Sequence, residues 1–143
     1  HASCSGDRPA SGSEESKARG RKVRMAISGS EGSRSTGNAA GLDMIAGLEE
    51  FVIGFNFGEI WSREIIDLKT RCMIVLGMLT AMGRTPQVTA YTRYALHLGI
   101  TPEEIAEVLL QAIPYAGLPA AFNGMQAASD VFAEKGVTVS NPV

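Results

Sequence analysis

The sequence has 143 residues, of which 45% are hydrophobic, and a formal net charge of -2. A chain of this length suits a single domain with one hydrophobic core. The slightly acidic balance argues against a nucleic-acid partner, because nucleic-acid binding draws on clustered lysine and arginine residues. The basic run from Lys17 to Lys22 is the exception, and it is interpreted as a solvated helix face, with contact to an anionic partner as the alternative.

Cysteine and histidine residues are too few for a disulfide framework or a metal site. Cys4 lies in a polar segment and Cys72 in an apolar one, while His1 and His97 are the only histidines. We therefore expect a reducing compartment and no metal. No apolar run reaches about 18 residues, the length of a membrane-spanning helix, and the first residues lack the apolar centre of a secretory signal. These features predict a soluble, cytoplasmic protein with no membrane partner.

The first part of the chain is predicted to be a flexible tail followed by helices. Residues 1–16 are rich in serine, glycine and small polar side chains, which bury too little apolar surface to offset the entropy of ordering. A short helix is expected over Glu15–Ile27, followed by a loop rich in glycine and serine. Residues 42–61 are predicted to form one helix with a single apolar stripe. The stripe consists of Leu42, Ile45, Leu48, Val52 and Phe55.

Two further helices have clear start and stop signals. Asp67 is a predicted N-cap for a helix over 68–82, whose apolar residues occur nearly all round and indicate a central position. Pro86 marks the first turn of the next helix, where a missing amide hydrogen is tolerated, and Gly99 ends it.

The C-terminal part contains the clearest helix signal in the chain. In "TPEEIAEVLLQAIPYAG", Thr101 is a predicted N-cap and forms a capping box with Glu104. Pro114 is expected to kink this helix near its end. A last helix is predicted over 119–135, and Gly136 ends it.

These patterns predict an all-α fold. A two-residue alternation occurs only in the short C-terminal segment, residues 137–143, so no strand is expected. The predicted organisation is one helical domain over residues 17–136 between the two tails.

Three motifs occur in order along the chain: "GEIW" at 58–61, "GITPEEI" at 99–105 and "YAGLPAA" at 115–121. Each is ordinary in a helical protein, but their order and spacing resemble the carboxymuconolactone decarboxylase family over roughly residues 17–134. The resemblance implies the AhpD-like fold with about six helices. It also implies an obligate homo-oligomer, either a homotrimer or a homohexamer.

The resemblance further implies a cofactor-independent lyase of aromatic catabolism. Such an enzyme removes CO2 from a cyclic carboxylated lactone, similar to 4-carboxymuconolactone, and leaves an enol-lactone. A substrate carboxylate that lies against apolar walls loses its hydration, which favours the release of CO2. Hydrogen-bond donors then stabilise the negative charge left on the lactone, and an acid protonates the ring carbon. The expected partner is therefore a small cyclic carboxylic acid or lactone.

Tyr91 marks a departure from the family pattern. Related thiol peroxidase partners carry a glutamate, a cysteine pair and a histidine, but the corresponding positions here hold Cys72, Arg84, Gln87 and Tyr91, so disulfide exchange is excluded. The decarboxylases tend to keep a histidine where Tyr91 stands. A phenol, with a reference pKa of about 10, donates a hydrogen bond or a proton but is a poor base near neutrality. The alternatives are another decarboxylation, isomerisation or cyclisation in specialised metabolism, and a non-catalytic helical oligomer.

Glu59 and Tyr91 are the predicted catalytic residues. Glu59 occupies the acidic position of the family, and a closed apolar pocket would favour its protonated form and make it a general acid. The alternative is an exposed carboxylate paired with Arg63 one turn further on. Tyr91 either takes part in a pocket or packs against Tyr94 and Leu98.

Four residues are candidates for substrate binding: Trp61, Arg71, Arg93 and His97. A guanidinium binds a carboxylate in bidentate geometry, although surface and inter-subunit ion pairs are the alternative role of an arginine. Trp61 forms a pocket wall or packs in the core. His97 is the weakest candidate, because it lies off the Tyr91 face and the helix macrodipole alone favours a histidine near a C-terminus.

Sulfur-containing side chains are assigned mainly to the core. Cys72 is predicted to be a buried small hydrophobe. The methionines Met73, Met78, Met82 and Met125 are predicted core residues, of which some line an adaptable apolar pocket.

Overall fold

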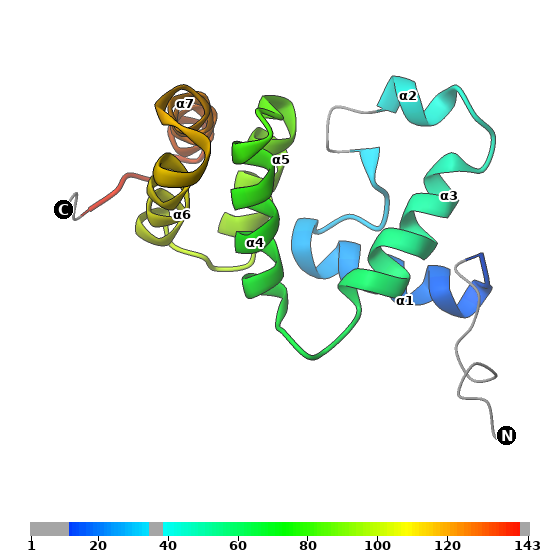
Figure 1. Ribbon diagram of the computed structural model, residues 1–143. Coiled ribbons are helices and arrows are strands. Elements are labelled where there is room, and N and C mark those ends of the chain that lie inside the picture. The colour runs from blue at the N-terminus through cyan, green and yellow to red at the C-terminus, as the bar shows by residue number, and fades with distance from the viewer. Residues whose placement is uncertain (1–11, 35–38, 141–143) are drawn as a thin grey trace, which may run out of the picture. The chain divides into compact units, whose positions relative to one another are not determined.

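A computed structural model of the chain describes residues 12–34 and 39–140, and every regular element in these ranges is a helix (Figure 1). The elements are α1 (Glu14–Ser28), α2 (Ala39–Asp43), α3 (Leu48–Val52), the π-helix η3 (Ile53–Trp61), α4 (Leu68–Ala81), α5 (Thr85–His97), α6 (Pro102–Ala116) and α7 (Leu118–Lys135). The predicted all-α class is confirmed for the described residues. Among these helices, none combines the length and the apolar character that crossing a membrane requires.

The described residues form two compact units. The first contains α1, α2, α3 and η3, and its main contact is between α1 and η3. The second contains α4 to α7, where α4 packs against α5, α6 and α7, and α7 also packs against α5 and α6 (Figure 1). The predicted central position of α4 is confirmed within this second unit. The single domain over residues 17–136 stays a prediction, and most of the predicted N-terminal tail, residues 1–11, lies outside the described residues.

Two glycines let α1 and η3 approach each other at backbone distance. A Cβ atom at Gly20 would lie 2.0 Å from the carbonyl oxygen of Ile53, and one at Gly58 would lie 2.1 Å from that of Ser16. Neither position has room for a side chain without a backbone shift. The close approach places short side chains of α1 directly against η3.

The segment from 42 to 61 differs from the single helix that the apolar stripe predicts. The chain leaves the helical conformation before Gly47, which has a φ of 79°, and α3 then continues into the π-helix. Hydrogen bonds from residue i to i+5 put more residues into each turn, so apolar positions spaced for an α-helix no longer share one face. Ile45 and Phe55 of the predicted stripe are accordingly exposed. The buried face of η3 consists instead of Ile53, Gly54, Phe57, Gly58 and Trp61.

The start signals predicted in the second unit are confirmed. Asp67 accepts a hydrogen bond of 2.8 Å from the backbone amide of Thr70 and caps α4. Thr101 and Glu104 form the reciprocal capping box of α6, with distances of 3.1 and 3.0 Å. These caps satisfy amide groups that the first turn of a helix leaves without an internal partner.

Candidate functional site

Glu59 lies in the last turn of η3, and its carboxylate faces α1. Its Oε1 atom accepts a hydrogen bond of 3.1 Å from Nη2 of Arg19 and lies 2.6 Å from the hydroxyl oxygen of Ser16. The Glu59 side chain is only 13% exposed. This environment differs from both alternatives that the sequence suggested, because the carboxylate is shielded from solvent yet held by polar groups.

Ser16 and Arg19 also bind the backbone of η3. The Ser16 hydroxyl lies 2.9 Å from the carbonyl oxygen of Gly54, and Ser16 is fully buried. Nε of Arg19 donates a 3.1 Å hydrogen bond to the carbonyl oxygen of Gly58. Arg19 therefore connects the Glu59 carboxylate to the helix that carries it through two separate donors, which restricts the rotation of that side chain. The single hydroxyl proton of Ser16 is shared between the Glu59 carboxylate and the Gly54 carbonyl oxygen.

Trp61 lies two residues beyond Glu59 in the core of the first unit. It is 4% exposed, and its ring centroid lies 5.9 Å from that of Phe57. The guanidinium carbon of the fully buried Arg24 lies 4.9 Å from the centre of the Phe57 ring, within the range of a cation–π interaction. Trp61 thus forms an aromatic pair with Phe57 on the buried face of η3.

Tyr91 lies in the second unit, on α5, and is buried. Its ring meets that of Tyr94 edge to face, with centroids 4.9 Å apart. The Cys72 sulfur lies 3.7 Å from the Tyr91 carbonyl oxygen. Burial raises the pKa of the Cys72 thiol to about 12, which disfavours the reactive thiolate and confirms that Cys72 is a buried small side chain.

Arg93 follows Tyr91 on α5 and is engaged in a bidentate ion pair. Its Nε and Nη2 atoms donate to the two carboxylate oxygens of Glu134 on α7, at 2.8 and 3.0 Å. The hydrogen bond from Arg93 lowers the pKa of Glu134 below its usual value. Two of the donors that would bind a substrate carboxylate are therefore occupied within the unit.

The remaining candidates occupy less enclosed positions in the second unit. Arg71 is half-buried on α4, and His97 is exposed in the last turn of α5. The structure thus places Glu59 and Trp61 in the first unit and the other candidates, Arg71, Tyr91, Arg93 and His97, in the second.

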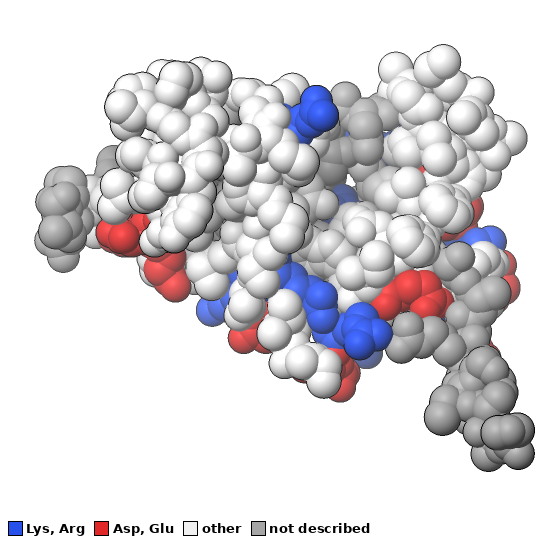
Figure 2. All heavy atoms as spheres, viewed as in Figure 1, with Lys and Arg blue, Asp and Glu red and all other residues white. Residues whose placement is uncertain are grey.

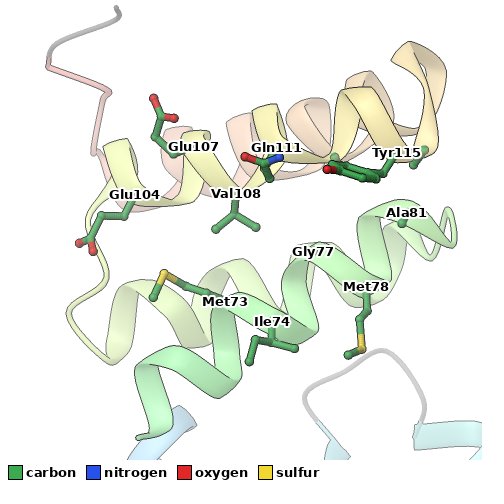
Figure 3. Close-up of a pocket in the computed structure, with 12 residues that line it drawn as sticks. Met73, Ile74, Gly77, Met78, Ala81, Glu104, Glu107, Val108, Gln111 and Tyr115 are labelled. Carbon is green, nitrogen blue, oxygen red and sulfur yellow. The ribbon is translucent and has the colours of Figure 1, made fainter. Parts of the chain in front are cut away.

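An apolar groove of about 620 Å³ lies between α4 and α6 (Figure 3). Val108 points from α6 toward α4, and the ring of Tyr115 lies along the α4 side of its helix. Met73 and Met78 also line the groove, as predicted for some of the methionines. Met78 and Met82 are 55% and 58% exposed, so the predicted core position is wrong for both. The sequence motifs did not place this groove between α4 and α6, although the steps from 104 to 108, 111 and 115 mark one face of a helix.

The charge of this groove does not suit a carboxylate ligand. Among the described residues that line it, Glu104 and Glu107 carry charge and none is lysine, arginine or histidine. Glu107 points away from α4 (Figure 3). The face over α6 and α7 is largely uncharged in Figure 2, with acidic atoms near its lower edge. The groove therefore fits an apolar partner better than an anion.

The described residues show no group of three or more histidine, cysteine or acidic side chains that could hold a metal ion. Fold and site together define an all-helical protein with a shielded carboxylate on a π-helix. Residues 46–130 match the model of the Carboxymuconolactone decarboxylase family, and the chain belongs to this family. The resemblance seen in the sequence motifs is thereby confirmed.

Three curated relatives are similar to the chain. A 4-carboxymuconolactone decarboxylase from Acinetobacter baylyi is 34% identical over 89 residues, which are 62% of this chain and 66% of that protein. An uncharacterized 15.0 kDa protein from the nqo9–nqo10 intergenic region of Paracoccus denitrificans is 38% identical over 81 residues, which are 55% of this chain and 60% of that protein. Nitrosuccinic acid decarboxylase npaB from Metarhizium robertsii is 30% identical over 77 residues, covering 54% of each. The chain thus spans 54% to 66% of the length of these relatives.

Proposed function

We propose that the chain is a cofactor-independent decarboxylase of a cyclic carboxylated lactone similar to 4-carboxymuconolactone, and that the product is an enol-lactone. Membership of the family and the name of the Acinetobacter baylyi relative support this activity. The structural observation that carries it is the Glu59 carboxylate, which lies within the matched residues and is shielded and held by polar groups.

The reaction needs no oxidant or reductant. The bond between the ring carbon and the substrate carboxylate breaks, its electron pair stays on carbon, and CO2 leaves. The charge spreads into the unsaturated lactone, where a hydrogen-bond donor stabilises it, and an acid then delivers one proton to carbon. Electrons and atoms balance with a single proton taken up for each CO2 released.

We assign Glu59 and Tyr91 as the acid–base groups or hydrogen-bond donors of this reaction. Glu59 is the carboxylate described above, and Tyr91 supplies a phenol at the position where the family tends to keep histidine. Trp61, Arg71, Arg93 and His97 remain proposed substrate-binding residues. Glu134 occupies Nε and Nη2 of Arg93, so a substrate carboxylate would bind through Nη1 and the remaining Nη2 hydrogen, or would displace Glu134.

Release of CO2 from 4-carboxymuconolactone by the purified protein tests this function, with Tyr91→His measured beside it. Turnover by the unmodified chain supports the proposal and shows that a phenol replaces the imidazole. Turnover only after the histidine is introduced contradicts this substrate for the native chain. No turnover by either protein contradicts it as well.

A second candidate is decarboxylation of a different acid. The relative from Metarhizium robertsii is named for nitrosuccinic acid, whereas that from Acinetobacter baylyi is named for 4-carboxymuconolactone, so the relatives of this chain carry names for different substrates. Tyr91 in place of histidine favours such a change, because a phenol and an imidazole differ in basicity near neutral pH. CO2 release from a panel of cyclic and open-chain acids with a neighbouring electron-withdrawing group distinguishes the two substrates.

We also propose that the chain assembles as a homotrimer or homohexamer. Its support is the exposed apolar side chains of the second unit, which water would otherwise contact. Ile74, Met78, Tyr115, Leu118 and Phe122 are between 43% and 87% exposed. Sedimentation velocity measures the mass, and Tyr115→Asp is expected to weaken the assembly, whereas a wild-type monomer at micromolar concentration would contradict it.

A further inference from the structure

The residues that hold Glu59 come from a helix outside the family match. The matched residues begin at position 46, whereas α1 spans Glu14–Ser28 and contributes both Ser16 and Arg19. Gly20 and Gly58 bring the two helices to backbone contact, so the position of α1 on η3 is closely defined. The environment of the candidate catalytic carboxylate is therefore built in part by a segment that lies outside the matched residues.

We propose that Arg19 and Ser16 are positioning residues for Glu59, which fix one carboxylate oxygen and leave the other for the reaction. The proposal rests on the function proposed above. Both contacts are made to Oε1. Among the described residues, the hydrogen bonds given for the Glu59 carboxylate all go to Oε1, and the side chain as a whole is 13% exposed. Oε2 is therefore the oxygen left for a substrate or a transferred proton.

The geometry favours positioning over direct substrate binding. Ser16 is fully buried, so its hydroxyl reaches the carboxylate but not a ligand. Arg19 uses Nε on the Gly58 carbonyl and Nη2 on Glu59, which aligns its planar fork along η3. A substrate carboxylate would compete with both of these contacts. Fixing the orientation of a reacting group in this way lowers the entropic cost of the chemical step.

The same helix provides a matched control for a purely structural ion pair. Arg21, two residues from Arg19, donates a 2.8 Å hydrogen bond to Glu50 of α3. This pair also joins α1 to the α3–η3 segment, but it does not touch Glu59. Loss of either arginine removes one interhelical ion pair, and only loss of Arg19 releases the Glu59 carboxylate.

The test compares Arg19→Gln, Arg19→Lys and Ser16→Ala with Arg21→Gln, measuring kcat and KM for the acid that the wild type decarboxylates. We expect kcat to fall roughly 10- to 100-fold in Arg19→Gln while KM changes less than about twofold, because a misplaced catalytic group costs up to about 100-fold in rate. Arg19→Lys should recover part of kcat, since it keeps the charge but not both hydrogen bonds. Arg21→Gln should match the wild type.

Several outcomes would overturn the proposal. A raised KM with unchanged kcat in Arg19→Gln would make Arg19 a substrate-binding residue. An equal loss of kcat in Arg21→Gln would show that any weakening of the α1 contact lowers activity. If Ser16→Ala fails to fold, as judged by circular dichroism, kcat of Arg19→Lys is compared with that of Arg21→Gln. A lower kcat in Arg19→Lys alone supports the positioning role, and equal values contradict it.

A second measurement separates this proposal from the proposed function. If the wild type decarboxylates none of the acids tested, that function fails, and the 13C resonance of the Glu59 carboxyl carbon, assigned with Glu59→Gln, reports the positioning directly. We expect this resonance to move in Arg19→Gln and to stay in place in Arg21→Gln. An unchanged resonance in Arg19→Gln would show that Arg19 does not hold the carboxylate.

Discussion

The hydroxyl oxygen of Ser16 lies 2.6 Å from the Oε1 atom of Glu59, although 43 positions separate the two residues in the chain. The contact exists because α1 and η3 meet at glycines, where a side chain on either helix would collide with the backbone of the other. A carboxylate near the end of a helix is ordinarily solvated, but this one is shielded by a neighbouring helix.

Glu59→Gln is expected to lower kcat by about 100-fold or more, the usual contribution of a positioned acid or base. Glutamine keeps the shape of the side chain and one acceptor oxygen toward Arg19, so helix content should be retained. The matched control is Glu50→Gln, which removes a carboxylate of the same unit that pairs with Arg21. Steady-state CO2 release measures both, and full activity of Glu59→Gln would show that the site assignment is wrong.

Tyr91→Phe is expected to lower kcat by about 100- to 1000-fold, because it removes a hydrogen-bond donor from the proposed site. The ring is retained, so the edge-to-face contact with Tyr94 should persist and the melting temperature should change little. Tyr94→Phe is the control, since it deletes the other hydroxyl of the same ring pair. Equal activity losses in the two variants would indicate a general packing effect instead of a role for the Tyr91 phenol.

Gly20→Ala is expected to destabilise the protein by roughly 1–3 kcal/mol, the usual cost of forcing an extra group into a packed interface. The new Cβ would lie 2.0 Å from the carbonyl oxygen of Ile53, and a backbone atom cannot rotate away. Gly77→Ala on α4 is the opposite case, because its Cβ would lie 3.8 Å from the nearest atom, in Val108. It should stabilise the helix by about 0.5–1 kcal/mol.

Urea unfolding of both glycine variants measures this difference. We expect the free energy of unfolding of Gly20→Ala to lie below that of the wild type and that of Gly77→Ala to lie above it. A stable Gly20→Ala protein would mean that α1 and η3 do not pack at backbone distance.

Glu134→Gln is expected to lower the melting temperature at pH 7, and the difference from the wild type should shrink in acid. The hydrogen bond from Arg93 lowers the folded-state pKa of Glu134 below its usual value. Stability from this pair is therefore fully present above the unfolded-state pKa and is lost as the pH falls through the lower folded-state pKa. Thermal melts between pH 7 and pH 3 measure the difference, and a gap that stays constant in acid would contradict the ion pair.

Local sequence signals predicted the second unit well. The N-caps Asp67 and Thr101 stand where helices begin, and the helix after Pro86 ends one residue from the predicted position. These signals depend on neighbouring residues only, through hydrogen bonds to the first free amides of a helix. They carry no information about which helices meet. For that reason the exposure of Met78 was not predicted, and the apolar pocket expected beside some methionines was not placed between α4 and α6.

The segment around Glu59 shows the limit of periodicity. Its apolar residues fit a regular α-helix, but the helix is interrupted before Gly47, and α3 then continues into a π-helix. The hydrogen-bonding pattern changes which residues share a face, and no local signal specifies that change. The motif at residues 58–61 identified Glu59 as a candidate catalytic residue. It did not predict that Ser16 and Arg19 contact the Glu59 carboxylate.

The sequence by itself determined the helical class, the caps, the family and the candidate side chains, because these follow from local chemistry and from motif spacing. The tertiary structure alone decided that Glu59 is shielded, that Ser16 and Arg19 hold one of its oxygens, and that Arg93 is engaged by Glu134. The physical reason is that these contacts join residues about 40 positions apart. Such pairs are formed by the packing of whole helices, which depends on the shapes of both surfaces at once and not on any short stretch of the chain.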